Sequence, residues 1–299
     1  MTLREAIERN ELLISDGGMG TELQKLGLPL DSCGDAWCLT HPDRVAAVHR
    51  LYAEAGSSLV STNTFSSNRF ALAKHGLADK QAEIARAGAR IAREVMAGRG
   101  WVLGSVGPCG ELMEPLGTLT ADALRASLEV QIGALLEGGA DAILLETMTA
   151  LDEVAIALEV AHALKAPFVI VTGAFDPTKS GPRTMMGARP EQLAALAAEG
   201  GADVVGANCG RLAAESDFLA LIERMRAAGM PLMLQPNAGQ PEMQGSDIVY
   251  HCGPEDLAER LAPLARHVKI LGGCCGSTPA HIRAIRERVK PRVAGSATY

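Results

Sequence analysis

Ala142-Ile143-Leu144-Leu145, followed directly by Glu146, is one of eight short apolar runs whose recurrence along the chain decides the fold. Each run is bounded by Gly, Pro, Asn or Asp, and near-continuous apolar runs of this length fit parallel strands that are buried on both faces. The other seven runs are residues 12–15, 58–61, 102–105, 168–171, 204–207, 232–235 and 268–271.

Helical patterns fill the gaps between these runs. Thr40-His41-Pro42-Asp43 predicts a helix start with Thr40 as the N-cap, and Thr120 and Thr278-Pro279 predict two more. Apolar residues then recur at helical spacing in each case: Val45, Val48 and Tyr52; Leu124, Leu128, Ile132 and Leu135; Ile282, Ile285 and Val289. Eight alternating strand–helix units predict an α/β fold that closes into a (β/α)8 TIM barrel.

The chain of 299 residues fits one such barrel, which typically needs about 250 residues. We predict a single domain over residues 1–299, with a loosely held tail from about residue 290. The Gly/Pro-rich loop 176–190, which contains Met185 and Met186, is expected to cover one end. A doubly wound open sheet is the alternative, although no G-x-G-x-x-G motif follows the first predicted strand.

Composition indicates which partners and which cellular compartment to expect. The net charge is −7 without a run of like charges, which argues against nucleic acid and anionic membranes as partners. No secretory signal or membrane-spanning window is apparent, and seven cysteines, two of them adjacent, indicate reduced thiols that serve a metal or chemistry. We therefore expect a cytoplasmic protein. No long apolar surface in the sequence indicates an oligomeric state.

Polar residues gather where the predicted strands end. They are Asp16-Gly17-Gly18, Asn63, Glu146, Asn208-Cys209-Gly210, Pro236-Asn237-Ala238-Gly239 and Gly272-Gly273-Cys274-Cys275-Gly276. All follow the carboxyl ends of strands, the face at which barrel enzymes place their chemistry. Segments far apart in the sequence are therefore expected to meet around one mouth.

Three cysteines of this set form a candidate metal site. Cys274 and Cys275 can face one ion only if the backbone turns, which the flanking glycines permit, and Cys209 ends a strand two positions away around the barrel. Three thiolates on Zn²⁺ would leave one coordination position open, as in catalytic sites. The alternatives are small buried residues or a strained Cys274–Cys275 redox pair. The remaining cysteines lack such a context and are interpreted as inert: Cys33, Cys38, Cys109 and Cys252.

Two acids and two asparagines complete the candidate site. Asp16 and Glu146 could hold a substrate ammonium group at the mouth, or they could cap a helix or pair with an arginine. Asn63 and Asn237 each offer a donor and an acceptor, although loop asparagines often bond the local backbone.

Four segments resemble the zinc-dependent homocysteine S-methyltransferases in the same order along nearly the whole chain. They are Asp16-Gly17-Gly18-Met19-Gly20-Thr21-Glu22-Leu23, Thr62-Asn63-Thr64-Phe65, Gly206-Ala207-Asn208-Cys209 and Gly272-Gly273-Cys274-Cys275-Gly276. The resemblance implies zinc on Cys209, Cys274 and Cys275, and methylation of the homocysteine sulfur to give methionine. Asp16 and Glu146 would hold the substrate amino group. Gly17, Gly18, Asn63, Asn208 and Asn237 complete the predicted substrate site.

The methyl donor differs among members of this family. Thr62-Asn63-Thr64-Phe65 and Pro236-Asn237-Ala238-Gly239 are similar to the homocysteine module of cobalamin-dependent methionine synthase, which favours a methylcorrinoid. Its folate and corrinoid carriers would then act from separate proteins. Betaine and sulfonium donors, S-methylmethionine or S-adenosylmethionine, are the alternatives.

A quaternary ammonium donor favours an aromatic cage, yet only 3% of residues are aromatic. Trp37, Phe65 and Phe175 are expected near the mouth, with Trp37 as a single stacking surface. Thr147 stands where the animal betaine enzymes that this chain resembles carry a tyrosine.

Two hypotheses from other classes remain. A zinc-storing or redox barrel would use the cysteines without a methyl-transfer substrate, but it leaves Asp16 and Glu146 unexplained. A phosphate-binding barrel would use Gly272-Gly273, but it leaves the paired cysteines unexplained.

Overall fold

Eight parallel strands form a nearly closed barrel, which confirms the predicted fold class. The computed structural model describes residues 1–9, 11–245 and 247–289. Neighbouring strands pair in the order β1-β10-β7-β6-β5-β4-β3-β2. The strands are β1 (Leu13–Ile14), β2 (Leu59–Ser61), β3 (Trp101–Val106), β4 (Ala142–Met148), β5 (Val169–Gly173), β6 (Val204–Asn208), β7 (Leu232–Gln235) and β10 (Ile270–Leu271). Between β1 and β2 the Ser58 N–H donates to Ile14 O at 2.8 Å, which brings the two ends of the sheet together.

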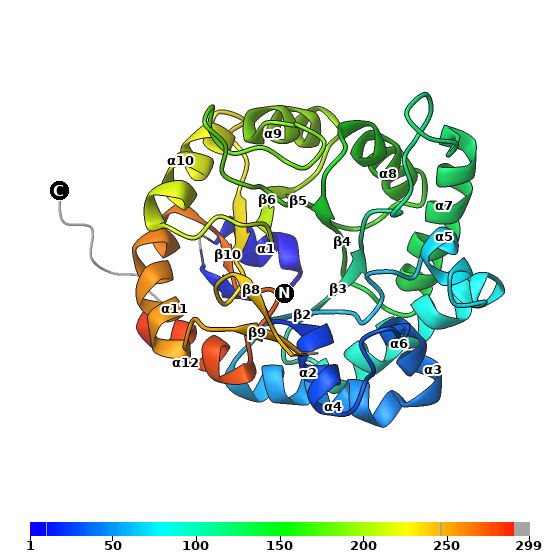
Figure 1. Cartoon of the computed structure of the whole chain (residues 1–299), viewed down its shortest axis with the longest axis horizontal. Coiled ribbons are helices and arrows are strands. Elements are labelled where there is room, and N and C mark those ends of the chain that lie inside the picture. The colour runs from blue at the N-terminus through cyan, green and yellow to red at the C-terminus, as the bar shows by residue number, and fades with distance from the viewer. Residues whose placement is uncertain (10, 246, 290–299) are drawn as a thin grey trace.

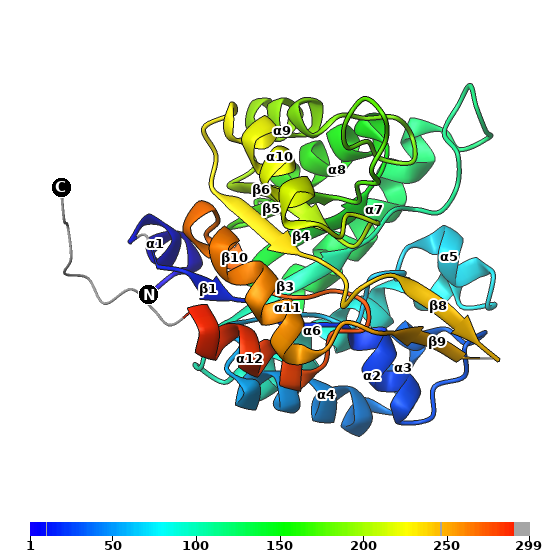
Figure 2. The same ribbon diagram turned by 60° about the vertical axis from the view of Figure 1, so that its left-hand side comes forward.

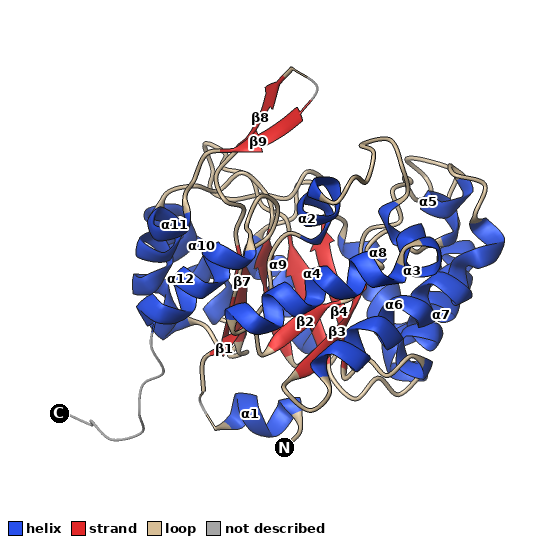
Figure 3. Ribbon diagram, turned by 90° about the horizontal axis from the view of Figure 1, so that it is seen from below, coloured by secondary structure: helices blue, strands red, loops and turns tan. Residues whose placement is uncertain are grey.

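The strands are buried on both faces, as their apolar runs predict. On β4, Ala142 and Leu144 pack in the barrel interior, while Ile143 and Leu145 pack in the larger core beneath the helices. The interior is closed at the amino ends of the strands by α1 (Leu3–Glu8), whose Leu3 and Ile7 join the interior cluster. Figure 3 shows α1 at this end of the barrel.

Helices surround the barrel on the outside (Figure 1). The longer ones are α4 (Pro42–Ala55), α6 (Gln81–Met96), α7 (Ala121–Glu137), α8 (Leu151–Ala163), α9 (Pro190–Glu199), α10 (Glu215–Arg226), α11 (Pro254–Leu261) and α12 (Pro279–Val289). The shorter ones are α2 (Met19–Lys25), α3 (Trp37–Thr40), α5 (Arg69–Ala73) and the 3-10 turns η1 (Gly34–Ala36), η2 (Ala78–Lys80) and η3 (Ala262–His267).

The predicted helix starts are mostly confirmed. Thr120 caps α7 by accepting a hydrogen bond from Ala123 N, and α12 begins at Pro279. The prediction that Thr40 is the N-cap of α4 is wrong, because His41 occupies that position and Thr40 is the last residue of α3. The Thr40 hydroxyl instead donates to Ala36 O at 3.2 Å.

One element has no counterpart among the predicted strands. β8 (Pro241–Gln244) and β9 (Asp247–Tyr250) form an antiparallel hairpin after β7. All four residues of β8 are exposed, so the segment lacks the apolar run that marks the barrel strands. The hairpin projects beyond the carboxyl ends of the strands, opposite α1 (Figures 2 and 3).

The loop after β5 is tied to its neighbours at the carboxyl end of the barrel. Thr184 Oγ1 donates to Thr149 O at 2.6 Å, and Asp176 forms an ion pair with Arg211 at 2.9 Å. Met185 of this loop is 83% exposed. The tail predicted from residue 290 lies outside the described residues. Among the helices that the structure describes, none is long and apolar enough to span a membrane.

Candidate metal and substrate site

The barrel interior changes from apolar to polar toward the carboxyl ends of the strands. Because side chains alternate along a strand, the residue two positions after each inward apolar residue also faces inward. Leu13 is followed in this way by Ser15, Leu103 by Ser105 and Leu144 by Glu146. The corresponding residues of β2, β5 and β7 are Ser61, Thr172 and Gln235, and on β6 Asn208 follows the inward-facing Val204 by four positions. The floor of the mouth is therefore a layer of hydrogen-bonding groups.

Cys209, Cys274 and Cys275 meet at this mouth. Their three sulfur atoms lie within 4.8 Å of one another, and the Cys274 and Cys275 sulfurs are 3.9 Å apart. Cys209 adopts a left-handed conformation (φ 56°) immediately after β6, while Gly276 (φ 76°) turns the chain after the paired cysteines. The turn expected from the flanking glycines is thus present. All seven cysteines lie in the described part of the chain, and each is a free thiol.

Backbone hydrogen bonds hold the two cysteine segments against the end of β7. Cys209 N–H donates to Gln235 O at 3.1 Å, and Cys274 N–H donates to Pro236 O at 2.9 Å. The thiols of Cys274 and Cys275 hydrogen-bond to Cys209, which lowers the pKa of Cys209 and raises that of Cys274. The three sulfurs are therefore close enough to ligate one ion.

These residues fit a thiophilic metal ion. Soft thiolate ligands select metals such as zinc, and three of them leave room for a fourth ligand. Asn237 lies beside the cluster, with its Nδ2 3.6 Å from the Cys209 sulfur and 3.0 Å from Gly210 O. Its Oδ1 is buried without a hydrogen-bond partner in the described structure. An unpartnered oxygen on a side chain that touches the Cys209 sulfur is consistent with a site that a cation completes.

Two acids face the same mouth, of which Asp16 is buried and Glu146 is half-buried. Asp16 accepts hydrogen bonds from Ser61 N (2.7 Å) and from the hydroxyls of Ser61 and Ser15 (both 3.2 Å), while Glu146 accepts one from Ser105 Oγ. Burial raises the pKa of each acid to about 7, and the charge of Asp16 further raises the pKa of Glu146. Within residues 1–9, 11–245 and 247–289, no lysine or arginine forms an ion pair with either carboxylate. Both acids therefore lack the cation that would offset their charge.

A third acid near the mouth, Asp35, is buried and lies outside the set of residues predicted from the sequence. Its Oδ2 accepts hydrogen bonds from Ser66 N and Ser67 Oγ, both at 2.8 Å, and burial raises its pKa to about 6. Its charge also raises the pKa of Glu146, so it lies close to the mouth. Asp35 belongs to η1 rather than to the end of a strand, so the pattern of polar residues after apolar runs does not include it.

Asn208 is occupied within the protein. Its Oδ1 accepts from Thr147 N (2.7 Å) and Thr172 Oγ1 (2.6 Å), and its Nδ2 donates to Thr147 Oγ1 (2.7 Å) and approaches the Cys274 sulfur (3.8 Å). An amide side chain has two donor hydrogens and two acceptor lone pairs, and all four have partners here. The sequence predicts that Asn208 contacts the substrate directly. In the structure, its hydrogen bonds go to neighbouring protein groups and hold Thr147 and Thr172 in place.

The remaining predicted substrate residues lie around the mouth in different settings. Asn63 Nδ2 donates to Gly34 O at 2.9 Å and approaches the Cys38 sulfur at 3.6 Å. Gly17 and Gly18 lie against the cysteine loop: an added Cβ would be 2.9 Å from Ser277 O at Gly17 and 3.0 Å from Cys274 O at Gly18. Close packing requires glycine at both positions, whatever part they take in binding.

The expectation that Trp37 offers a stacking surface is wrong. Trp37 is buried, with the His41 ring at a centroid distance of 4.5 Å and the Arg44 guanidinium 5.0 Å from the ring centroid. Phe175 is also buried, so only Phe65 of the three predicted aromatics is exposed. Tyr250, by contrast, lies beside the Cys275 thiol, so Phe65 and Tyr250 are the described aromatic side chains that border the mouth.

A TIM barrel with a three-sulfur cluster at its carboxyl end defines a class of barrel that can bind a metal ion at its mouth. A family model for homocysteine S-methyltransferases matches residues 13–289. The chain belongs to this family.

Individual relatives agree with this assignment. The chain is 34% identical over 296 residues to methionine synthase of Mycobacterium tuberculosis and 34% identical over 298 residues to that of Mycobacterium leprae. Each alignment covers 93% of this chain but 24% of the relative, so the chain spans about a quarter of their length.

Solved structures of the homocysteine methyltransferase MmuM from Escherichia coli share the fold. The metallated form has a TM-score of 0.78 at 23% identity and covers 96% of this chain and 99% of its own. The oxidized form has a TM-score of 0.74 at 25% identity and covers 93% and 96%.

Proposed function

We propose that this protein transfers a methyl group to the thiol of homocysteine, giving methionine, with Zn²⁺ held by Cys209, Cys274 and Cys275. The observation that carries the proposal is the meeting of three sulfurs within 4.8 Å at a mouth that also contains two acids, Asp16 and Glu146, for which the described structure has no ion-pair partner. Homocysteine has a thiol at one end and an ammonium group at the other. Its two ends match these two halves of the site.

The chain's residues orient the substrate. Asp16 and Glu146 receive the ammonium group, and Ser61 and Ser105 fix the directions of the two carboxylates. Zinc, when bound to the three cysteines, lowers the pKa of the substrate thiol so that the sulfur reacts as a thiolate. The sulfur lone pair then forms the new bond to the methyl carbon as the bond from carbon to the donor breaks, and the donor leaves with the electron pair.

The donor that we propose is a methylcorrinoid carried by a separate protein. Similarity to methionine synthases supports this choice, and so does the surface around the mouth. We call the exposed large apolar side chains of the loops that follow β1, β2, β3, β5 and β7 the apolar rim: Leu30, Phe65, Leu112, Leu116, Met185, Met186, Met243 and Ile248. Exposed apolar groups clustered around a mouth favour a macromolecular partner over a small polar donor.

Betaine is a weaker candidate, because Trp37 and Phe175 are buried and leave Phe65 and Tyr250 as the described aromatic side chains at the mouth. A sulfonium donor remains the alternative within the family, since three acids at the mouth, Asp16, Asp35 and Glu146, would attract a cation. The two cases differ in whether the apolar rim affects turnover.

A donor screen tests the proposal. Zinc-loaded protein and homocysteine would be offered a methylcorrinoid protein, free methylcobalamin, betaine, S-methylmethionine and S-adenosylmethionine in turn, with methionine measured as product. We expect methionine with the corrinoid donors. Zinc binding without homocysteine binding would instead support a zinc-storing or redox barrel.

A further inference from the structure

The segment that contains Asp16 and the loop that contains the paired cysteines lie side by side. Gly273 N–H donates to Asp16 O, and Gly18 N–H donates to Ser277 O, both at 3.0 Å. Within the cysteine loop, Ser277 Oγ donates to Cys274 O. The proposed anchor for the substrate amino group and two proposed metal ligands therefore belong to one hydrogen-bonded unit.

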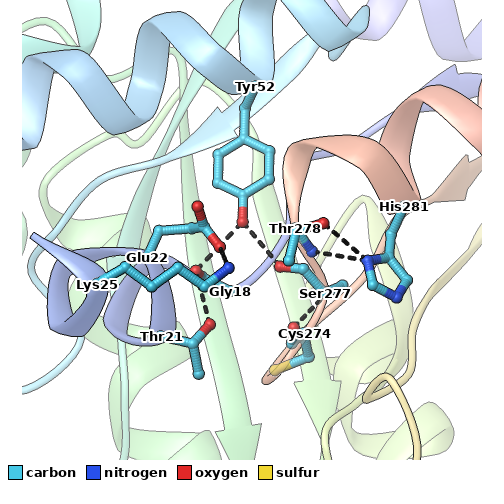
Figure 4. A network of polar contacts seen from close by, with 9 residues as sticks. All are labelled: Gly18, Thr21, Glu22, Lys25, Tyr52, Cys274, Ser277, Thr278 and His281. Carbon is cyan, nitrogen blue, oxygen red and sulfur yellow. Dashed lines mark hydrogen bonds and ion pairs between the residues drawn. The ribbon is translucent and has the colours of Figure 1, made fainter. Parts of the chain in front are cut away.

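Tyr52 joins this unit from outside the barrel. It lies on α4 with its side chain fully buried, and its hydroxyl is 2.9 Å from Ser277 O and 3.2 Å from Gly18 O. Figure 4 shows the hydroxyl between the two segments. The Tyr52 ring also packs tightly against Gly17, because a Cβ added to Gly17 would lie 3.0 Å from Tyr52 Cε1. One O–H thus faces a carbonyl of each segment.

On its other side the cysteine loop is held by His281. Its Nδ1 accepts from Thr278 N–H at 3.1 Å, and its Nε2 is 2.8 Å from Cys252 O. These bonds fix the loop to the start of α12 and to the end of the β8–β9 segment. The His281 bonds do not reach the Asp16 segment. Tyr52, in contrast, connects the Asp16 segment with the cysteine loop.

We propose that Tyr52 is a positioning residue that sets the spacing between the Asp16 carboxylate and the Cys274–Cys275 sulfurs. This inference rests on the proposed function, because that spacing must match the distance between the ammonium group and the sulfur of homocysteine. A shift of about 1 Å in such a constellation is enough to reduce binding or turnover substantially. Burial keeps Tyr52 protonated as a donor, since it raises its pKa well above the usual value.

Tyr52→Phe isolates the hydroxyl, because the ring contacts with Gly17 remain. The matched control is Ser127→Ala, which also removes a buried hydroxyl: Ser127 Oγ accepts from Arg69 N at 3.0 Å and from Gln81 Nε2 at 3.1 Å, and it touches neither segment. Both variants are expected to fold and to lose similar thermal stability.

Two measurements separate positioning from general stability. The first is the rate at which each zinc-loaded protein releases zinc to a chromogenic chelator, which we expect to rise about tenfold in Tyr52→Phe and to stay unchanged in Ser127→Ala. The second is a double-mutant cycle on the homocysteine dissociation constant with Asp16→Asn. If Tyr52 positions Asp16, Asp16→Asn will weaken binding less in the Tyr52→Phe background than in the wild type.

Unchanged zinc release, additive effects in the cycle, or equal effects of Ser127→Ala would each overturn the proposal. Failure of the wild-type protein to bind homocysteine would instead contradict the proposed function. The two failures are distinguishable, because zinc release alone still reports whether Tyr52 holds the cysteine loop.

Discussion

Thr147 and Asn208 exchange two hydrogen bonds of 2.7 Å across the mouth of the barrel. Thr147 has a φ of 60°, which is rare for a β-branched residue, and it lies where the pairing of β4 with β5 shifts register between Leu145 and Met148. Thr147 directly follows Glu146. By bonding Thr147, the Asn208 side chain stabilises the backbone turn at this point of β4, and this turn sets the direction of the Glu146 carboxylate.

We expect Asn208→Leu to destabilise the protein by about 2–4 kcal/mol, because it leaves the half-buried Thr147 N–H without its partner and removes the side chain that holds the strained turn in place. Chemical denaturation measures the effect. Thr172→Val is the control, since it removes only one bond to Asn208 and should cost about 1 kcal/mol. Equal stability of the two variants would show that Asn208 does not hold the turn.

The fold could be predicted from the sequence because each barrel strand is buried on both faces and is therefore a continuous apolar run. The β8–β9 hairpin could not, because its first strand is exposed on both faces and carries no apolar pattern. α1 was missed for a different reason. It is a short helix of six residues, and its apolar side chains are buried because they close the barrel interior. That contact depends on the closed barrel and leaves no local pattern in the sequence.

The same contrast holds for the site. Cys209, Cys274, Cys275, Asp16 and Glu146 were found because they follow apolar runs, and parallel strands bring such positions together. Ser105 was within reach, since it stands two residues after the inward-facing Leu103. Tyr52 and Asp35 were not, because one reaches the site from the outer ring of helices and the other from a 3-10 turn.

The metal assignment predicts about one zinc per chain. Cys275→Ser should lose most of it, because two remaining thiolates hold the ion more weakly and serine is a poor ligand at neutral pH. Metal analysis after dialysis measures the content. Cys109→Ser is the matched control, since Cys109 is buried outside the cluster and its thiol donates to Glu111 O at 3.3 Å. Stoichiometric zinc in Cys275→Ser would falsify the ligand assignment.

Glu146→Gln should stabilise the substrate-free protein at pH 8 while weakening homocysteine binding. The folded-state pKa of Glu146 is raised from 4.5 to about 7, so the folded state binds its proton more tightly than the unfolded state. The stability this supplies is present below pH 4.5 and is lost as the pH rises through about 7. The variant avoids that loss, because its amide carries no charge at either pH. Denaturation at pH 5 and pH 8 checks the sign: the gain should appear at pH 8 and shrink at pH 5.

Homocysteine affinity should fall as the pH drops below about 7, where Asp16 and Glu146 take up protons and no longer attract an ammonium group. Binding near this pH should release protons from the carboxyl groups as well as from the thiol. Calorimetry in buffers of different ionisation enthalpy counts them. Glu146→Gln should release fewer protons than the wild type, and an unchanged count would remove Glu146 from the ammonium site.

The apolar rim offers a way to identify the donor without relying on activity alone. Met243 of the hairpin is 67% exposed and Met185 is 83% exposed, and both belong to loops at the mouth. Met185→Glu combined with Met243→Glu should raise the KM for a corrinoid-carrying protein about tenfold or more, because a charge buried at an interface must be desolvated without a partner. Homocysteine affinity should stay unchanged, since both side chains are exposed and neither belongs to the proposed substrate site. Val130→Glu is the matched control, because Val130 is 43% exposed on α7, away from the mouth.

If the double variant and the control have the same KM for the carrier protein, the apolar rim is not its docking surface. A small sulfonium donor then becomes the better explanation of the acidic mouth.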